Sequence, residues 1–164
     1  MAELTVLDEK LAEVLGLAQA AQQAAKKVGT LAKRERDKSL TDLLTAMGRD
    51  AKAVEDRCQK VAATRNGMKS SIDKKARETK VEVGDFMKTY LEDAEALDGL
   101  EFLSMAEAGE LAHWRILATL NKRAKERSIT ALTSFALPIQ ERHVREVASH
   151  SLRLAAEEDP SETA

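Results

Sequence analysis

The stretch GELAHWRILATLNKRAKERSITALTSFALPIQERH, residues 109–143, predicts two long helices joined by a short turn. Apolar residues recur every three or four positions on both sides of residues 125–128, which is the spacing of a helix with one buried face. Two helices joined by a short turn lie antiparallel, so positions equally far from the turn face each other. The stretch therefore predicts a helical hairpin. Pro138 either kinks its second helix or starts a new one.

The rest of the chain shows the same helical spacing. A heptad runs from Leu4 to Val28, and a second stripe runs from Leu40 to Val61 with Ser39 as the expected N-cap. Asn66-Gly67 interrupts the helical pattern, and residues 68–82 are mostly charged. A further apolar stripe ends at Asp98-Gly99. We therefore predict an all-α, antiparallel four-helix bundle with a charged crossover or extra helix in the middle. Residues 1–158 form its single domain, and residues 159–164 form a frayed tail.

Composition narrows the class of partner. The formal net charge is −2, and acids are interleaved with the basic residues, so we expect no binding to nucleic acid or to an anionic membrane. No apolar run approaches the ~18 residues of a membrane span. The first ten residues lack the apolar run of a signal peptide, and the single cysteine, Cys58, fits a reducing compartment. The expected location is cytoplasmic, with Cys58 as a small buried side chain.

Two pairs of polar residues interrupt the apolar stripes of the hairpin. Glu110 and His113 lie on the first helix, and Gln140 and His143 lie on the second. Glu110 and His143 are equally far from the turn, as are His113 and Gln140. The spacing therefore predicts that these four side chains meet in one layer of the interior.

Two interpretations of this layer stay open. Imidazole and carboxylate groups suit iron, manganese or zinc, and bundle cores are a common place for such sites. Alternatively, the four side chains satisfy one another in a hydrogen-bonded network without a metal. Glu107 and Glu146 are expected to flank the layer, either solvated or supporting it from outside. His150 is expected at its rim.

The segment from about residue 100 to 158 resembles the ferritin-like four-helix proteins, nearest a bacterial stress-associated branch of largely unknown function. The resemblance is carried by MAEAGELAHWRILATLNKRA (105–124) and ALPIQERHVREVASHSLRLA (136–155). It implies ferritin-like topology and two carboxylate-rich helix pairs that hold two metal ions, whose reduced irons react with oxygen or peroxide. Glu110 and His113 would then match one ligand set. His143 would match the histidine of the other set, with Gln140 in place of its glutamate.

The chain departs from that pattern in its first half. The first stripe carries no carboxylate, and the second offers only Asp50 or Glu55 at its edge. We therefore expect a degenerate site that holds one iron, manganese or zinc ion. The leading hypothesis is a cytoplasmic, ferritin-like stress-associated protein. The alternative is a non-catalytic scaffold or protein-interaction module. Under either hypothesis, copies of the chain can self-associate through their helix faces.

Overall fold

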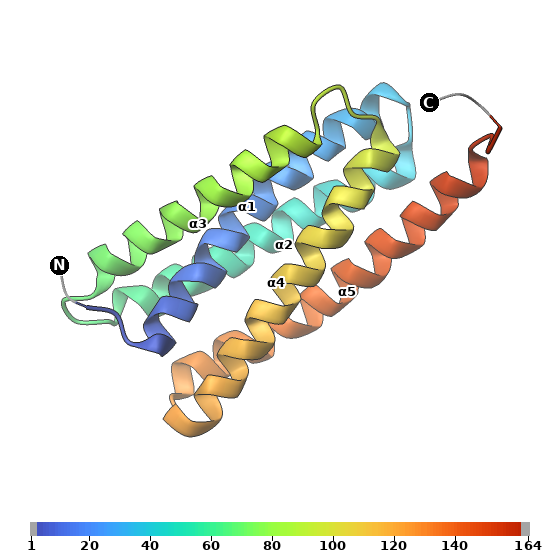
Figure 1. Ribbon diagram of the computed structural model, residues 1–164. Helices are drawn as coiled ribbons and strands as arrows, with labels where there is room; N and C mark the ends of the chain where they lie inside the picture. The colour runs from blue at the N-terminus through green and yellow to red at the C-terminus, as the bar shows by residue number, and fades with distance from the viewer. Residues whose placement is uncertain (1–2, 162–164) are drawn as a thin grey trace.

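Residues 3–161, which the computed structural model describes, fold into five helices that run side by side (Figure 1). They are α1 (Val6–Arg34), α2 (Lys38–Ala63), α3 (Lys69–Tyr90), α4 (Ala96–Ala124) and α5 (Arg127–Glu157). Short connections join them, so consecutive helices run antiparallel. The prediction of an all-α chain is confirmed. The charged stretch 68–82 lies largely within α3.

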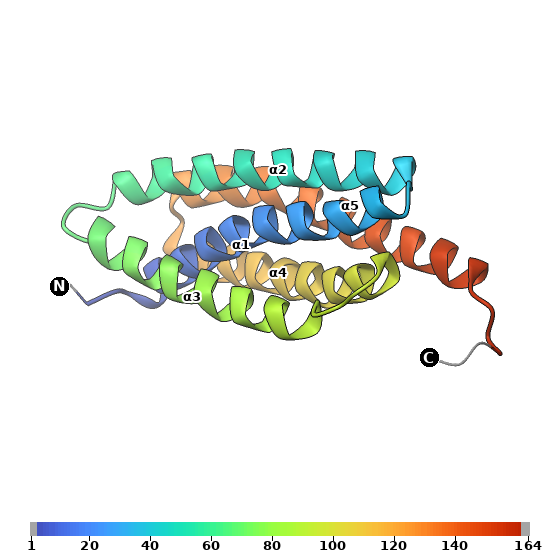
Figure 2. The ribbon, with the colours of Figure 1, turned by 90° about the horizontal axis from the view of Figure 1, so that it is seen from above.

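The central element of the arrangement is α1. It lies between α2 and α3 and also packs against α4, while α5 packs against α4 and α2 (Figures 1 and 2). Helices α3 and α5 lie on opposite sides of the molecule (Figure 2), and most of the contacts of α3 are with α1.

A glycine makes the contact between α1 and α3 close. A Cβ at Gly16 would lie 2.4 Å from the carbonyl oxygen of Ala76 and 2.8 Å from Cβ of Thr79. Real side chains do not come that near, so only glycine allows α3 to pack at this distance.

Two predicted helix boundaries are wrong for reasons of capping. Asp37, not Ser39, caps α2, because its carboxylate accepts a hydrogen bond from the Leu40 amide at 2.9 Å. The expected break at Asp98-Gly99 lies inside α4. Glu95 and Asp98 form a capping box there, and Gly99 leaves room for the Val28 side chain.

The turn between α4 and α5 is tighter than the sequence suggested. Lys125 adopts a left-handed conformation with φ 58°, and Asn121 bonds the backbone of Glu126 through both ends of its amide. Helix α5 therefore begins at Arg127, within the predicted turn 125–128, and continues through Pro138 without a restart.

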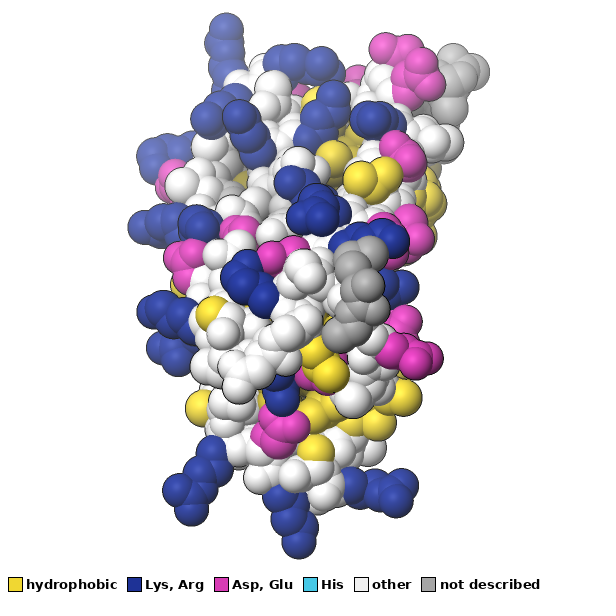
Figure 3. Space-filling model, turned by 90° about the vertical axis from the view of Figure 1, so that its left-hand side faces the viewer, with side chains coloured by type: hydrophobic (Ala, Val, Ile, Leu, Met, Phe, Trp, Pro, Cys, Tyr) yellow, Lys and Arg dark blue, Asp and Glu magenta, His cyan; other side chains and the backbone are white. Residues whose placement is uncertain are grey.

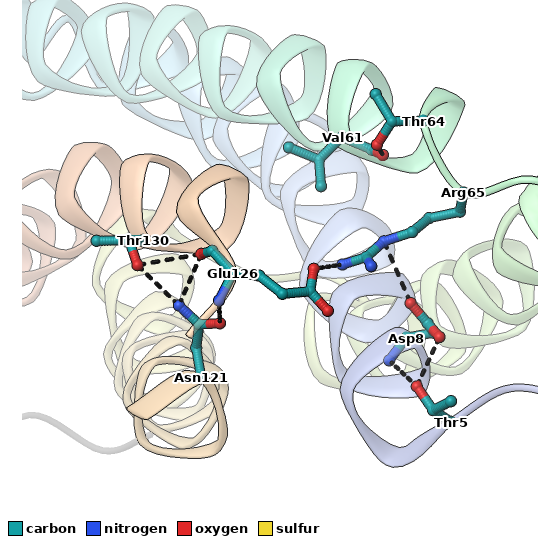
Figure 4. Close-up of polar contacts among 8 residues, drawn as sticks. All are labelled: Thr5, Asp8, Val61, Thr64, Arg65, Asn121, Glu126 and Thr130. Carbon is teal, nitrogen blue, oxygen red and sulfur yellow. Dashed lines mark hydrogen bonds and ion pairs between the residues drawn. The ribbon is translucent and has the colours of Figure 1, made fainter. Parts of the chain in front are cut away.

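Polar contacts fix this end of the molecule (Figure 4). Arg65, in the connection after α2, pairs with Asp8 at 3.3 Å and with Glu126 at 2.6 Å. Thr5 caps α1 by accepting a hydrogen bond from the Asp8 amide at 3.2 Å. The first turn of α1 is thereby joined to the α4–α5 turn.

Two apolar clusters make up the core of the described residues. One includes Val28, Leu44, Leu100 and Val147, and the other includes Leu11, Cys58, Trp114 and Leu132. Along both α4 and α5 the two clusters are separated by buried polar residues, so the interior has a polar layer near its middle.

The surface is mixed in character. On the face shown in Figure 3, Lys and Arg side chains have Asp and Glu side chains among them, and hydrophobic side chains form small separate groups. None of the helices between residues 3 and 161 combines the length and apolar character that a membrane span needs. The tail predicted for 159–164 is described only as far as Ser161, which bonds Asp159, and its last residues lie outside the described part.

Candidate functional site

The polar layer is built from one turn of α4 and one turn of α5. Glu107 and Glu110 lie three residues apart on α4, and Gln140 and His143 lie three apart on α5. Residues at that spacing share a helix face, and all four side chains are at most 3% exposed. Three of the four predicted residues, Glu110, Gln140 and His143, are therefore placed in the interior layer.

His143 connects three helices. Its Nδ1 lies 3.3 Å from Glu107 on α4, and its Nε2 lies 3.1 Å from Asp50 on α2. Burial alone lowers the pKa of His143, but hydrogen bonds and charge from Glu107 and Asp50 outweigh it and raise the pKa above its usual value. Arg142 pairs at 2.5 Å with the same Oδ2 atom of Asp50 that faces His143. With a carboxylate at each ring nitrogen, the arrangement favours the imidazolium form, in which both nitrogens donate.

Glu110 has a different environment. The indole of Trp114 donates a hydrogen bond to its carboxyl group at 3.3 Å. Burial, together with the negative charge of Glu107, raises the pKa of Glu110 to about 8. No Lys or Arg of the described chain pairs with it. Glu110 is therefore a neutral acid at pH 7, while Glu107 shares the charge of His143.

These groups do not converge on a metal-binding point. The two ring nitrogens of His143 face carboxylates on opposite sides of the ring. Within residues 3–161, no set of three or more His, Cys, Asp or Glu side chains is arranged to hold a metal ion. One atom of the layer nevertheless lacks a partner, since the buried amide oxygen of Gln140 makes no hydrogen bond.

His113 does not join the layer. Its side chain is 35% exposed and its Nδ1 lies 3.1 Å from Glu13 on α1, which also pairs with Lys10. The prediction that His113 and Gln140 meet in the interior is therefore wrong. Each successive position in the series 107, 110, 113 turns about 60° around the helix, so the third residue points towards α1 instead of α5.

The expectations for the flanking acids were partly wrong. Glu107 was expected beside the layer, but its side chain is 3% exposed and it bonds His143 directly. Glu146 is partly exposed and lies near Arg142, as a solvated charge would. Of the two acids at the edge of the second stripe, Asp50 reaches His143. Glu55 accepts hydrogen bonds from Gln19 and Gln22 on α1.

An apolar groove lies beside the layer, between α1, α3 and α4. It has a volume of about 250 Å³. Most of its walls are apolar, and its polar side chains are Glu107, Glu110 and His113. The remaining lining residues are Leu17, Ala20, Ala21, Ala24, Val83, Phe86, Phe102, Met105, Ala106 and Gly109.

Small residues account for the space in the groove. Four alanines and Gly109 line it, so the helices approach one another without filling the gap. At one wall Phe86 lies 5.6 Å from Phe102 between ring centroids. Phe86 and Met105 remain 49% and 45% exposed, which leaves apolar surface accessible at the groove. The sequence gives no specific signal for the groove, because the alanines of the first heptad equally suit a close contact between helices.

The other candidate residues have structural roles. Cys58 is fully buried, as predicted, and burial raises the pKa of its thiol, so it is a poor nucleophile. Trp114 fills the core and bonds Glu110. His150 lies outside the layer, beside Arg153, in agreement with a rim position.

The chain matches no protein-family model, no curated protein and no solved structure.

Proposed function

We propose that the protein is a ferritin-like helical bundle that binds a small, largely apolar molecule in the groove between α1, α3 and α4. In this proposal α1, α2, α4 and α5 form the four-helix core and α3 is the crossover. The contacts support it, because α1 neighbours α2 and α4, α5 neighbours α4 and α2, and α3 carries the chain from the end of α2 to the start of α4.

The groove carries the binding proposal. A dry apolar cavity of about 150 Å³ is known to accept benzene, and this groove offers about 250 Å³ behind partly exposed Phe86 and Met105. That space suits a single ring with a short side chain. Pockets lined mainly by apolar groups, with few polar ones at fixed positions, are the usual sites for small ligands.

The polar layer supports a binding role over a catalytic one. Both ring nitrogens of His143 face carboxylates, so the ring is a poor general base. Cys58 is buried with a raised thiol pKa. The lone buried cysteine also agrees with a reducing cytoplasm as the setting. Self-association through helix faces stays a prediction.

Calorimetric titration with ethylbenzene tests the proposal. We expect saturable one-to-one binding to the wild-type chain. Ala21→Leu places a larger side chain in the groove and should abolish the binding, whereas Ala148→Leu, at an exposed position on α5, should leave it unchanged. Absence of binding to the folded wild-type chain would show that the groove is not a ligand site.

The transition-metal site predicted from sequence is the second candidate. Two observations favour it: Glu110 pairs with no Lys or Arg of the described residues, and the Gln140 amide oxygen has no partner. The carboxylates at both nitrogens of His143 count against it. Titration of the chelator-treated protein with Mn²⁺, Zn²⁺ or Fe²⁺ tests it. One equivalent that His143→Ala loses and His150→Ala retains would support a metal site.

A further inference from the structure

The polar side of the groove is acidic. Of the side chains that line it, Glu107, Glu110 and His113 are the polar ones, and no Lys or Arg is among them. His113 is itself engaged by Glu13. A ligand with a carboxylate or phosphate would therefore meet two acids and no strong cation. A hydrogen-bond donor or a cation would instead find acceptors on the inner wall of the groove, which Glu107 and Glu110 form.

The charges around the inner wall leave a place for one more cation. His143 lies between Glu107 and Asp50, and Arg142 pairs with Asp50, so two cations match two carboxylates. Glu110 is the additional acid. It stays neutral because burial and the negative charge of Glu107 raise its pKa to about 8, and no Lys or Arg of the described residues pairs with it.

We infer that the ligand of the groove is a small amine, with its ammonium group bound at Glu107 and Glu110 and its apolar body along Phe86 and Met105. This inference rests on the proposed function and names the class of its ligand. The aromatic rings of Phe86 and Phe102 at the wall suit the apolar body of the ligand.

Binding of such a ligand moves a proton. Free primary amines are protonated at neutral pH, so the ammonium arrives with its charge and stabilises the carboxylate form of Glu110. The carboxyl O–H bond of Glu110 breaks, its proton leaves to the buffer, and the ion pair takes its place. A neutral alcohol of the same shape brings no charge and leaves Glu110 protonated.

The other ionisable groups near Glu110 set the background of this effect. They are Glu107 and His113 on α4, His143 on α5, Asp50 and Cys58 on α2, and Glu13 on α1. Of the described residues, α3 contributes only the apolar Val83 and Phe86 to the lining. Apart from Glu110, the acids nearest the layer are already paired with cations, so Glu110 is the group whose protonation the ligand changes.

Four probes of similar shape test the inference at pH 7: 2-phenylethylamine, 2-phenylethanol, 3-phenylpropionate and ethylbenzene. Calorimetry in buffers of different ionisation enthalpy gives both affinity and protons released. We expect the amine to bind about tenfold or more tighter than the alcohol, as a charged hydrogen bond does relative to a neutral one. Most of one proton should be released with the amine and almost none with the alcohol.

Glu110→Gln keeps the shape of the side chain and removes the charge. It should abolish proton release and the preference for the amine while 2-phenylethanol still binds; retained alcohol binding and helicity show that the groove is intact. Glu101→Gln, at an exposed position on the same helix, should behave as wild type. If ethylbenzene and the alcohol bind and the amine binds no better, or if Glu110→Gln retains the preference, the amine inference is wrong and the groove proposal stands. If none of the four binds, the groove proposal fails.

Discussion

Glu110 should make the protein less stable as the pH rises, and Glu110→Gln should remove that penalty. The pKa of Glu110 in the folded chain is about 8, against an ordinary value of 4.5. A raised acid pKa means that the folded state keeps its proton while the unfolded state loses it. The contribution of Glu110 to stability is therefore greatest below pH 4.5, falls as the pH rises through this window, and levels off above about 8.

The size of the effect follows from the shift. Each pH unit inside the window lowers the free energy of unfolding by about 1.4 kcal/mol. At pH 7 the buried carboxyl group of Glu110 thus costs roughly 3 kcal/mol. A glutamine has nearly the same shape, still accepts the hydrogen bond from Trp114, and does not ionise. The variant should match wild type near pH 4.5 and exceed it increasingly at higher pH.

Urea unfolding of both proteins at several pH values measures this difference. Subtracting the wild-type value from that of the variant cancels the titration of other groups, His143 included. Glu101→Gln, on the exposed side of the same helix, is the matched control and should give a difference near zero at every pH. A flat difference for Glu110→Gln between pH 4.5 and 8 would refute the reasoning, because it would mean that Glu110 ionises normally in the folded chain.

Three further predictions concern the layer and the core. His143→Leu leaves Glu107 without its imidazolium partner and should lower the free energy of unfolding, measured in urea, by about 3–5 kcal/mol. Because the pKa of His143 is raised, this loss of stability is largest below pH 6.5 and shrinks as the pH rises. Gly16→Ala should lower stability by about 1–3 kcal/mol and increase hydrogen exchange in α3, whereas Gly109→Ala, with open space around it, should be neutral or stabilising. Cys58 should react with a thiol reagent only after unfolding, and fast reaction of the folded chain would disprove its burial.

The sequence predicted the α4–α5 hairpin well because local chemistry defines it. When the turn is short, the apolar spacing on both sides of residues 125–128 allows only one register of the two helices. That register places Glu110, Gln140 and His143 in the interior. The boundaries were harder to predict, because several residues compete for each cap. Asp37 and Ser39 both suit an N-cap, and only the packed structure selects Asp37, which also pairs with Arg153.

The partners within the layer were less accessible to sequence reasoning. Facing positions on two helices were predictable from their distance to the turn, but a third helix also contributes to the layer. Asp50 reaches His143 because α2 packs against α5, and α1 draws His113 away from the layer towards Glu13. Those contacts depend on how the two halves of the chain pack together, which the local periodicity of each half leaves open.

The groove depends on the same packing between segments far apart in the chain. The alanines of α1 have the spacing of an ordinary tight helix contact, and the sequence offers no reason to expect free space beside them. Gly16 lets α3 pack close to α1 at Ala76 and Thr79, while Phe86 and Met105 stay partly exposed beside the groove. A buried acid without a paired cation therefore lies next to accessible apolar surface. That combination is costly for a purely structural core, because burying an unbalanced acid lowers stability, and it is the arrangement that a binding site for a cationic ligand requires.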